Sequence, residues 1–517
     1  MLLKQVFATK SLKVLLEEMA GDHQLKRVLG PWTLTSLGVG AVIGAGIFVA
    51  TGAAARHTAG PALMVSYIVA GVTCVFAALC YAEFASMAPV AGSAYTYAYT
   101  TMGELFAWII GWDLVLEYAV GAATVANGWS GYFQSILKKV GIVLPESLQQ
   151  AAVAYDAKTG EFVSTGSFVN LLAVVIVAII TAVLVKGIQE SAGFNALMVG
   201  IKVAAVLFVI LVGAFYINPD NWHPFAPYGW SGLSFFGIPV AGQTTPSGEP
   251  IGMLAGAAII FFAFIGFDSV STHAEEAINP QRDVPIGIIA SLIVCTVLYV
   301  AVVAVLTGMV KYDQIAADAG VSDAFQKVGL HWAEFIIAAA GVAGITSVLL
   351  VMMLSAPRVI LAMARDGLVP QKFFADVHPK FRTPWKSTIL IGLFVAVLAG
   401  MLPIDALLHL TNIGTLFAFV IVCAAVLIMR KTNPEAHRPF RCPLVPFVPI
   451  MGILTCLMLM FSLPAANWLR LIGWLGIGMV IYFCYGRFHS VMGKQLREEI
   501  VAHGVSPAGS VSDHLKH

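Results

Sequence analysis

The chain has 517 residues, of which 59% are hydrophobic and only 11% are charged, and its formal net charge is +1. An ordinary soluble domain carries about 25% charged residues, so this composition excludes that class and indicates a polytopic membrane protein. No basic, aromatic-rich patch suggests a nucleic-acid partner, and the seven cysteines include no CxxC pair that would predict a metal site.

Twelve apolar segments are candidates for membrane-spanning helices, each of which needs roughly 20 residues to cross the bilayer. They lie near 34–54, 62–88, 104–136, 168–186, 194–215, 252–275, 286–309, 333–363, 388–402, 406–430, 446–464 and 467–486. The predicted fold class is therefore an all-α polytopic membrane protein. An even number of spans places both termini on one side, and because most Lys and Arg residues then fall on that side, we assign it to the cytoplasm.

The first span contains Gly44-Ala45-Gly46 in the middle of an otherwise apolar run. Small residues at this depth favour a loosened helix, and unpaired backbone survives in a bilayer only beside protein, ligand or water. If the helix restarts after Gly46, its free N–H groups form a positive end suited to a carboxylate. Gly40 and Gly44 also match the small-xxx-small pattern of closely packed helices, which remains an alternative.

Two ionisable residues within the predicted spans are candidates for a functional role. Glu117, in the third span, could read a positive substrate side chain, pair with a polar neighbour or take part in proton transfer. Lys202 lies eight residues into the fifth span, at a depth where a lysine costs about 2.5–3.5 kcal/mol to insert. It either snorkels to the interface or points into the bundle, where it can lose its proton.

The sixth span repeats the interruption of the first. An apolar run from Ile259 contains Gly266 and then meets polar Asp268 before the span is long enough to end. Carbonyls freed around Phe262, Ala263 and Ile265 could bind an ammonium group. Two interrupted spans at matching places in two halves of a chain are typical of transporters with a substrate site at the membrane midplane, and a site with both features fits the zwitterionic head of an α-amino acid.

The spacing of the two interruptions suggests an internal duplication with an inverted second copy. The predicted organisation is a cytoplasmic N-terminal segment at 1–30, a first repeat at 31–216, an extracellular loop at 217–251, a second repeat at 252–430, two further helices within 431–487 and a cytoplasmic tail at 488–517. We expect no regular structure in this polar tail.

Three stretches identify a family. VGAVIGAGIFV (39–49), GFDSVSTHAEEAINPQRDVPIGII (266–289) and APRVILAMARDGLVP (356–370) resemble the amino acid–polyamine–organocation superfamily, and in detail the cationic amino acid transporters and their bacterial homologues. The resemblance implies a LeuT-like fold with two inverted repeats of five helices, helices 1 and 6 unwound, and two extra helices.

The resemblance also implies roles for single residues. The implied substrate-binding set is Val42, Ile43, Gly44, Ala45, Gly46, Glu117, Phe262, Ala263, Ile265 and Met352. The implied proton-coupling set is Lys202, Thr346 and Ser347, where an ammonium replaces the sodium ion of related transporters. No cofactor is implied, since the proton is the coupling ion.

Met352 departs from the animal cationic transporters, which carry a small polar residue at the aligned position. A bulky thioether there narrows the pocket and favours small neutral amino acids such as alanine over arginine and lysine. No P-loop, GxSxG or zinc motif supports an enzyme. The expected function is thus a proton-coupled L-amino acid importer of the plasma membrane, surrounded by lipid, with a small membrane subunit left open. The alternative is a membrane amino acid sensor that binds substrate but scarcely transports it.

Overall fold

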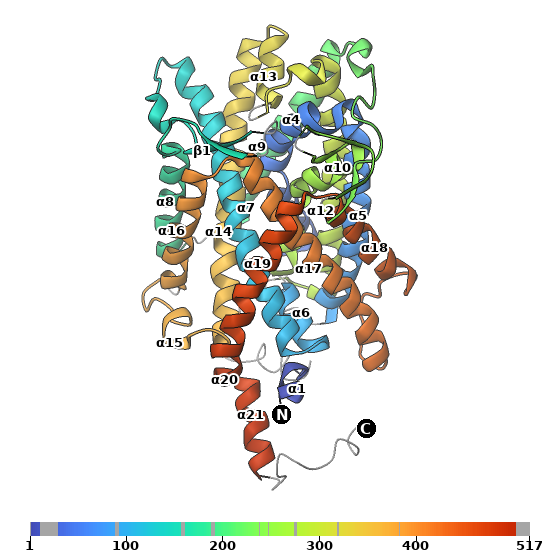
Figure 1. Cartoon of the computed structure of the whole chain (residues 1–517), viewed down its shortest axis with the longest axis vertical. Coiled ribbons are helices and arrows are strands. Elements are labelled where there is room, and N and C mark those ends of the chain that lie inside the picture. Colours follow the sequence, from blue (N-terminus) through green and yellow to red (C-terminus); the bar gives the residue numbers. More distant parts are fainter. Residues whose placement is uncertain are drawn as a thin grey trace.

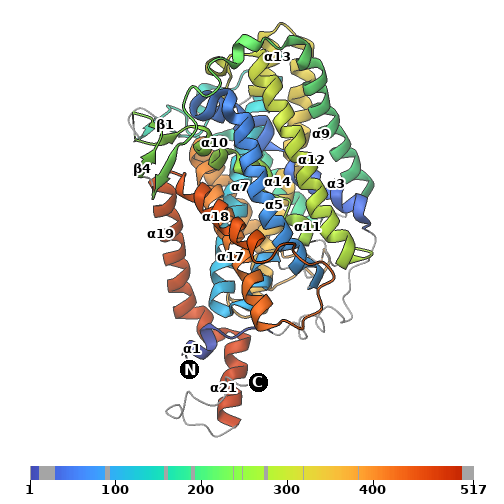
Figure 2. The same cartoon turned by 90° about the vertical axis from the view of Figure 1, so that its right-hand side faces the viewer.

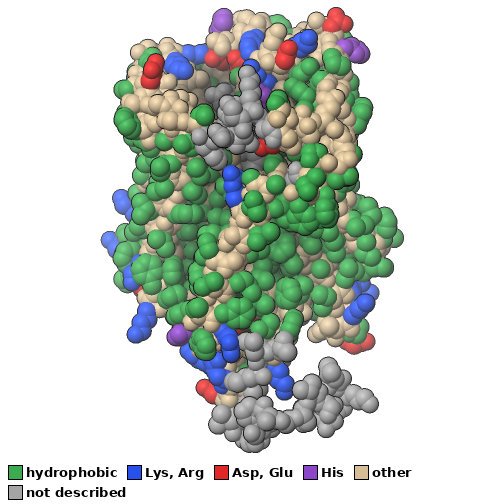
Figure 3. Space-filling model, viewed as in Figure 1, with side chains coloured by type: hydrophobic (Ala, Val, Ile, Leu, Met, Phe, Trp, Pro, Cys, Tyr) green, Lys and Arg blue, Asp and Glu red, His purple; other side chains and the backbone are tan. Residues whose placement is uncertain are grey.

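A computed structural model of the chain describes residues 2–10, 29–87, 93–156, 161–187, 192–236, 238–246, 248–272, 277–317, 320–381 and 383–502. The predicted N-terminal segment is therefore described only at its two ends, and residues 11–28 lie outside the described part. The long helices run roughly along one common axis (Figure 1). Apolar side chains cover the middle of the face in Figure 3, and most charged side chains gather toward its two ends.

The helices of the first half begin and end as follows: α1 (Leu2–Val6), α3 (Pro31–Val42), η1 (Gly46–Ala50), α4 (Thr51–Ala54), η2 (Ala55–Ala59), η3 (Gly60–Ala62), α5 (Leu63–Met87), α6 (Ser93–Thr101), α7 (Glu104–Lys139), η4 (Glu146–Leu148), α8 (Leu171–Lys186), α9 (Ala192–Gly213), η5 (Ala214–Tyr216) and η6 (Pro219–Trp222). Those of the second half are α10 (Met253–Ile260), η7 (Phe261–Phe264), α11 (Ser269–Thr272), α12 (Pro280–Met309), η9 (Tyr312–Gln314), α13 (Gly320–Lys327), α14 (His331–Arg365), α15 (Gln371–Phe374), α16 (Trp385–Met401), α17 (Ile404–Thr432), α18 (Phe447–Phe461), α19 (Ala465–Ile481), η10 (Tyr482–Gly486), α20 (Arg487–His489) and α21 (Val491–Ala502).

The apolar helices coincide with the predicted spans. By length and composition, seven described helical stretches could cross a membrane, and four shorter apolar helices accompany them. Each predicted span overlaps one of these stretches, and the first two spans share the stretch Pro31–Met87. The chain is therefore a multi-pass membrane protein.

The chain is mostly helical as expected, and the described part of its connecting loops adds three short antiparallel strand pairs. β1 (Val153–Asp156) pairs with β2 (Glu161–Ser164), β3 (Leu233–Phe235) with β4 (Ile238–Ala241), and β5 (Gln243–Thr244) with β6 (Pro250–Ile251). All are between two and four residues long. Strands this short carry almost no alternating pattern, so the sequence gives little sign of them.

The tail was also predicted incorrectly in part, since 491–502 form helix α21. Both α21 and α1 lie at the same end of the molecule, while α13 lies at the other (Figure 1). One hydrogen bond helps to fix the start of α21: the N–H of Val491 donates to the carbonyl of Asp366 at 3.0 Å.

Contacts between long helices form the centre of the bundle. α7 packs along α14, and α3 packs against both α9 and α12. Figure 2 shows α3, α9 and α12 together on one side of the molecule and α19 on the opposite side. α5 packs against α10 and η7, and η7 contacts η1, so the segments that follow the interrupted ends of α3 and α10 meet.

Candidate functional site

The interruption predicted in the first span is present. Helix α3 ends at Val42, and Ile43 then takes an extended conformation with φ −70° and ψ 106°. Helical structure resumes at Gly46 as the π-helical segment η1. Within the described residues, the backbone amides of Gly44, Ala45 and Gly46 make no hydrogen bond. Three N–H donors are therefore left at the start of a helical segment, the arrangement that binds anions.

The second interruption is also present. Helix α10 tightens into the 3₁₀ segment η7, the backbone of Ile265 becomes extended, and α11 starts at Ser269. Gly266 has φ +115°, and a Cβ at this position would lie 2.8 Å from the carbonyl oxygen of Ala41. Glycine is required here on both counts, because other residues avoid this backbone conformation and would also collide with α3.

The two interruptions contact each other directly. A Cβ on Gly46 would lie 2.2 Å from Cα of Ala263, so only glycine permits this approach. A Cβ on Gly44 would lie 2.5 Å from Cγ2 of Val348, which places this residue against α14. The glycines of the first break thus allow its backbone to meet both the second break and α14.

Tyr299 on α12 joins the two breaks. Its hydroxyl lies 2.8 Å from the carbonyl oxygen of Val42 and 3.0 Å from that of Ala263, and its one hydrogen can be donated to one of them at a time. The carbonyl of Phe262 accepts from the amide of Ile265 at 3.3 Å. The predicted freedom of the Phe262 and Ala263 carbonyls is therefore wrong for this conformation. Sequence reasoning missed Tyr299, although a hydroxyl-bearing residue in an apolar span is a usable signal.

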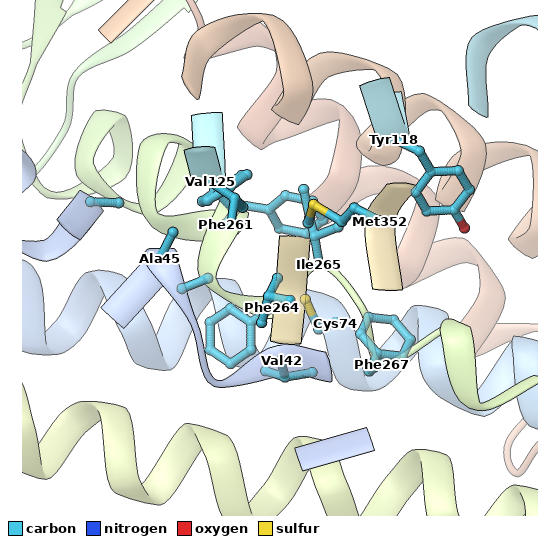
Figure 4. Close-up of a cluster of buried hydrophobic side chains, with 14 of the residues drawn as sticks. Val42, Ala45, Cys74, Tyr118, Val125, Phe261, Phe264, Ile265, Phe267 and Met352 are labelled. Atoms are coloured by element: carbon cyan, nitrogen blue, oxygen red, sulfur yellow. The ribbon is translucent and has the colours of Figure 1, made fainter. Parts of the chain in front are cut away.

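Buried apolar side chains pack together beside these breaks. In Figure 4 the thioether of Met352 points toward Phe261 and Ile265, with Val125 of α7 nearby. Met352 is 5% exposed, and its sulfur would lie 3.0 Å from a Cβ on Gly121. Met352 therefore packs on a glycine of α7 beside the second break.

Glu117 lies one helical turn before Gly121 on the same helix. Its side chain is 3% exposed, and neither carboxylate oxygen has a hydrogen-bond partner among the described residues. The next residue, Tyr118, donates to Oδ2 of Asp268 at 3.2 Å and so connects α7 to the second break. Glu117 is therefore close to the site, but its carboxylate makes no ion pair in this conformation.

Lys202 is fully buried and its ammonium contacts the first broken helix. Nζ lies 2.5 Å from the carbonyl oxygen of Gly40, and the aliphatic stem packs on Gly344 of α14, where a Cβ would lie 3.2 Å from Cγ of the lysine. The snorkelling alternative is wrong for this conformation, because the ammonium points into the bundle. The contact lies one helical turn before Gly44, the position near which it was predicted.

The two hydroxyls predicted beside Lys202 have different neighbours. Ser347 donates to the carbonyl of Gly344, the residue on which the lysine stem packs, at 3.2 Å. The hydroxyl of Thr346 instead accepts from Nε1 of Trp129 on α7 at 2.9 Å. The Ser347 hydroxyl therefore bonds within α14, to the residue that the lysine stem contacts. The Thr346 hydroxyl instead connects α14 to α7.

The chain is a multi-pass helical protein whose two broken helices contact each other. This fold and this site are typical of membrane permeases. Residues 29–483 match the family model described as amino acid permease. The chain belongs to this family, within the amino acid–polyamine–organocation superfamily, and is a permease rather than an enzyme.

Several relatives are similar over nearly the whole chain. The branched-chain amino acid permease BcaP of Bacillus subtilis is 47% identical over 95% of this chain and 99% of its own length. The methylthioribose transporter of the same organism is 43% identical over 95% of this chain and 100% of its own length. Human cationic amino acid transporter 4 is 36% identical over 81% of this chain and 63% of its own length. These relatives confirm the family that the three sequence stretches identified.

Proposed function

We propose that this chain is a proton-coupled importer of neutral L-amino acids with apolar side chains in the plasma membrane. In this proposal twelve spans form a LeuT-like fold, with inverted repeats at 31–216 and 252–430 and two added helices within 431–487. The position of α1 and α21 at one end supports an even number of spans, and the excess of Lys and Arg supports a cytoplasmic location for that end.

The observation that carries the proposal is the set of free amides at Gly44, Ala45 and Gly46. Each unsatisfied amide costs several kcal/mol in a membrane interior, and a substrate carboxylate satisfies more than one of them. At the adjoining second break, the carbonyl of Ile265 accepts no hydrogen bond among the described residues and is offered to the ammonium group. Because all of these partners are backbone groups, they recognise the head shared by α-amino acids and leave selectivity to the side-chain pocket.

The pocket supports a substrate with an apolar side chain. Met352, Phe261, Ile265 and Val125 present only carbon and sulfur to the space beside the breaks. A buried positive side chain would need a counter-charge, for which the carboxylate of Glu117, one turn from Gly121, is a candidate. The similarity to a permease named for branched-chain amino acids favours the same substrate class.

Lys202 is the proposed coupling group. As an ammonium it holds α3 and α9 together through the Gly40 carbonyl and rests on α14 at Gly344. Loss of its proton removes the charge-assisted hydrogen bond, which is worth about 1.5–3 kcal/mol, and lets α3 move away. Protonation from one side and release on the other then couple substrate movement to the proton gradient.

A second candidate substrate is methylthioribose, which the similarity to a transporter of that name favours. This compound has neither a carboxylate nor an ammonium group, so the backbone site described above would give it no advantage.

Competition for uptake of labelled leucine by the purified protein in liposomes tests the head-group site. Alanine, valine and isoleucine are expected to compete, while decarboxylated amines, N-acetylated amino acids and methylthioribose compete weakly. Efficient competition by amines that lack the carboxylate would contradict the assignment of Gly44, Ala45 and Gly46, and efficient competition by methylthioribose alone would favour the second candidate.

Replacing Met352 with serine is expected to widen the pocket toward Glu117 and to raise the ratio of arginine to alanine uptake about tenfold. The estimate follows from the discrimination of about 1–3 kcal/mol that a few side-chain atoms provide in a pocket. Uptake of both substrates is measured side by side. Met401→Ser is the control, because Met401 is 51% exposed at the end of α16. Equal ratios in Met352→Ser and the parent would show that Met352 does not line the pocket.

A further inference from the structure

Asp113 and Glu117 form a pair of buried carboxylates one turn apart on α7. Asp113 is 1% exposed and Glu117 is 3% exposed. Oδ2 of Asp113 and both oxygens of Glu117 have no hydrogen-bond partner in the described part of the chain. Unsatisfied buried polar atoms are rare in native proteins and indicate a missing ligand or water.

A cavity of about 10 Å³ lies against both carboxylates. It is enclosed by the two carboxylates together with Leu116 of α7, Leu410, Ile413 and Gly414 of α17, and Leu471 of α19. This volume holds one water molecule. Gly414 allows α17 to approach the carboxylate of Asp113 closely, since a Cβ on Gly414 would lie 2.9 Å from Oδ1 of Asp113.

Among the side chains that the structure describes, those around the pair do not supply two positive charges. The ionisable side chains that face Glu117 are Asp268, beyond η7, Tyr118 on α7 and Tyr81 on α5, and α17 contributes the hydroxyl of Thr415. On α19 the neighbouring cation along the helix is Arg470, which is only partly buried. Two carboxylates that share one buried space cannot both remain ionised, and a buried charge without a partner takes up a proton instead.

We propose that Asp113 and Glu117 bind one proton as a pair, through a single water in this cavity, and that this is a proton site separate from Lys202. A proton from solvent binds one carboxylate oxygen to give a carboxylic acid, which donates through the water to the other carboxylate. The pair then carries one negative charge instead of two. Glu117 borders the proposed substrate pocket, and Asp113 lies one turn farther from it on α7. A change in the charge of the pair on substrate binding would therefore act on α17 and α19, which line the cavity. The role of this pair in transport rests on the proposed proton-coupled function, whereas its binding of a proton does not.

Infrared spectroscopy of the full-length protein in lipid tests the proposal without requiring transport. The parent is expected to show the C=O stretch of a protonated carboxylic acid at neutral pH, shifted by exchange into D₂O and lost in alkaline buffer. The double variant Asp113→Asn/Glu117→Gln is expected to lose this band, and Asp113→Asn and Glu117→Gln alone are each expected to shift the pH at which it disappears. Asp283→Asn is the matched control, because Asp283 is also buried but accepts from the amide of Asn279 at 3.2 Å; it is expected to keep the band.

Several outcomes would overturn the proposal. The band could be absent from the parent, or it could persist unchanged in the double variant. Its disappearance on adding sodium chloride, but not choline chloride, would show that the pair holds sodium rather than a proton. Lys202→Ala is expected to retain the band, so a failure of Lys202 as coupling group is distinguishable from a failure of this pair. Thermal unfolding followed by tryptophan fluorescence checks that each variant is folded.

Discussion

The Lys202→Ala protein is expected to lose accumulation of substrate driven by an inward proton gradient. The lysine is fully buried, and its ammonium donates to the Gly40 carbonyl in the first broken helix. Without it, no group on α9 holds α3 in a protonation-dependent manner. Labelled leucine is expected only to equilibrate across the liposome membrane, with equal concentrations inside and outside, while binding in detergent is retained because the head-group contacts come from backbone elsewhere.

Lys311→Ala is the control for this variant, because Lys311 is exposed in the loop after α12. It is expected to accumulate leucine like the parent. Concentrative uptake by Lys202→Ala in response to the pH gradient would show that Lys202 is not the coupling residue. The Asp113 and Glu117 pair would then be the next candidate for the coupling group.

Gly46→Ala is expected to weaken substrate binding by about tenfold to a hundredfold. The added methyl group would lie 2.2 Å from Cα of Ala263, so the two broken segments must move apart. Overpacking of this kind costs about 1–3 kcal/mol, and the displacement also turns the free amides away from the substrate. Binding of labelled leucine to the purified protein in detergent measures the change.

Gly473→Ala is the matched control for the glycine variant, because a Cβ on Gly473 meets nothing within 4 Å. It is expected to bind leucine with the parent's affinity. Parent-like binding by Gly46→Ala would mean that the close contact between the breaks is not part of the binding-competent state.

The sequence predicted the helical architecture and both interruptions because membrane spans have strong compositional signals. Long apolar segments are distinctive, and Gly44-Ala45-Gly46 and Gly266 stand out inside them. The strand pairs in the loops could not be predicted, because strands of two to four residues have too short a pattern. The helix α21 was missed because its sequence is polar and its order depends on contacts with distant segments, such as the carbonyl of Asp366.

The contacts of the candidate site residues could not be predicted from the sequence. The sequence indicates that Lys202 is deep, yet it does not reveal that the ammonium reaches Gly40 rather than the neighbourhood of Gly44. The side-chain rotamer and the crossing angle of α9 with α3 decide this contact, and neither is encoded locally. Tyr299 was missed for the same reason, since its partners at Val42 and Ala263 come from two other helices.

The central claim is that the chain moves amino acids using a proton gradient, and concentrative uptake of leucine by the purified protein in liposomes tests it most directly. With an acidic exterior, the account predicts that internal leucine rises above the external concentration and that a protonophore abolishes the excess. Leucine binding without any uptake would contradict transport and favour the sensor alternative, and uptake that is unchanged by the protonophore would contradict proton coupling.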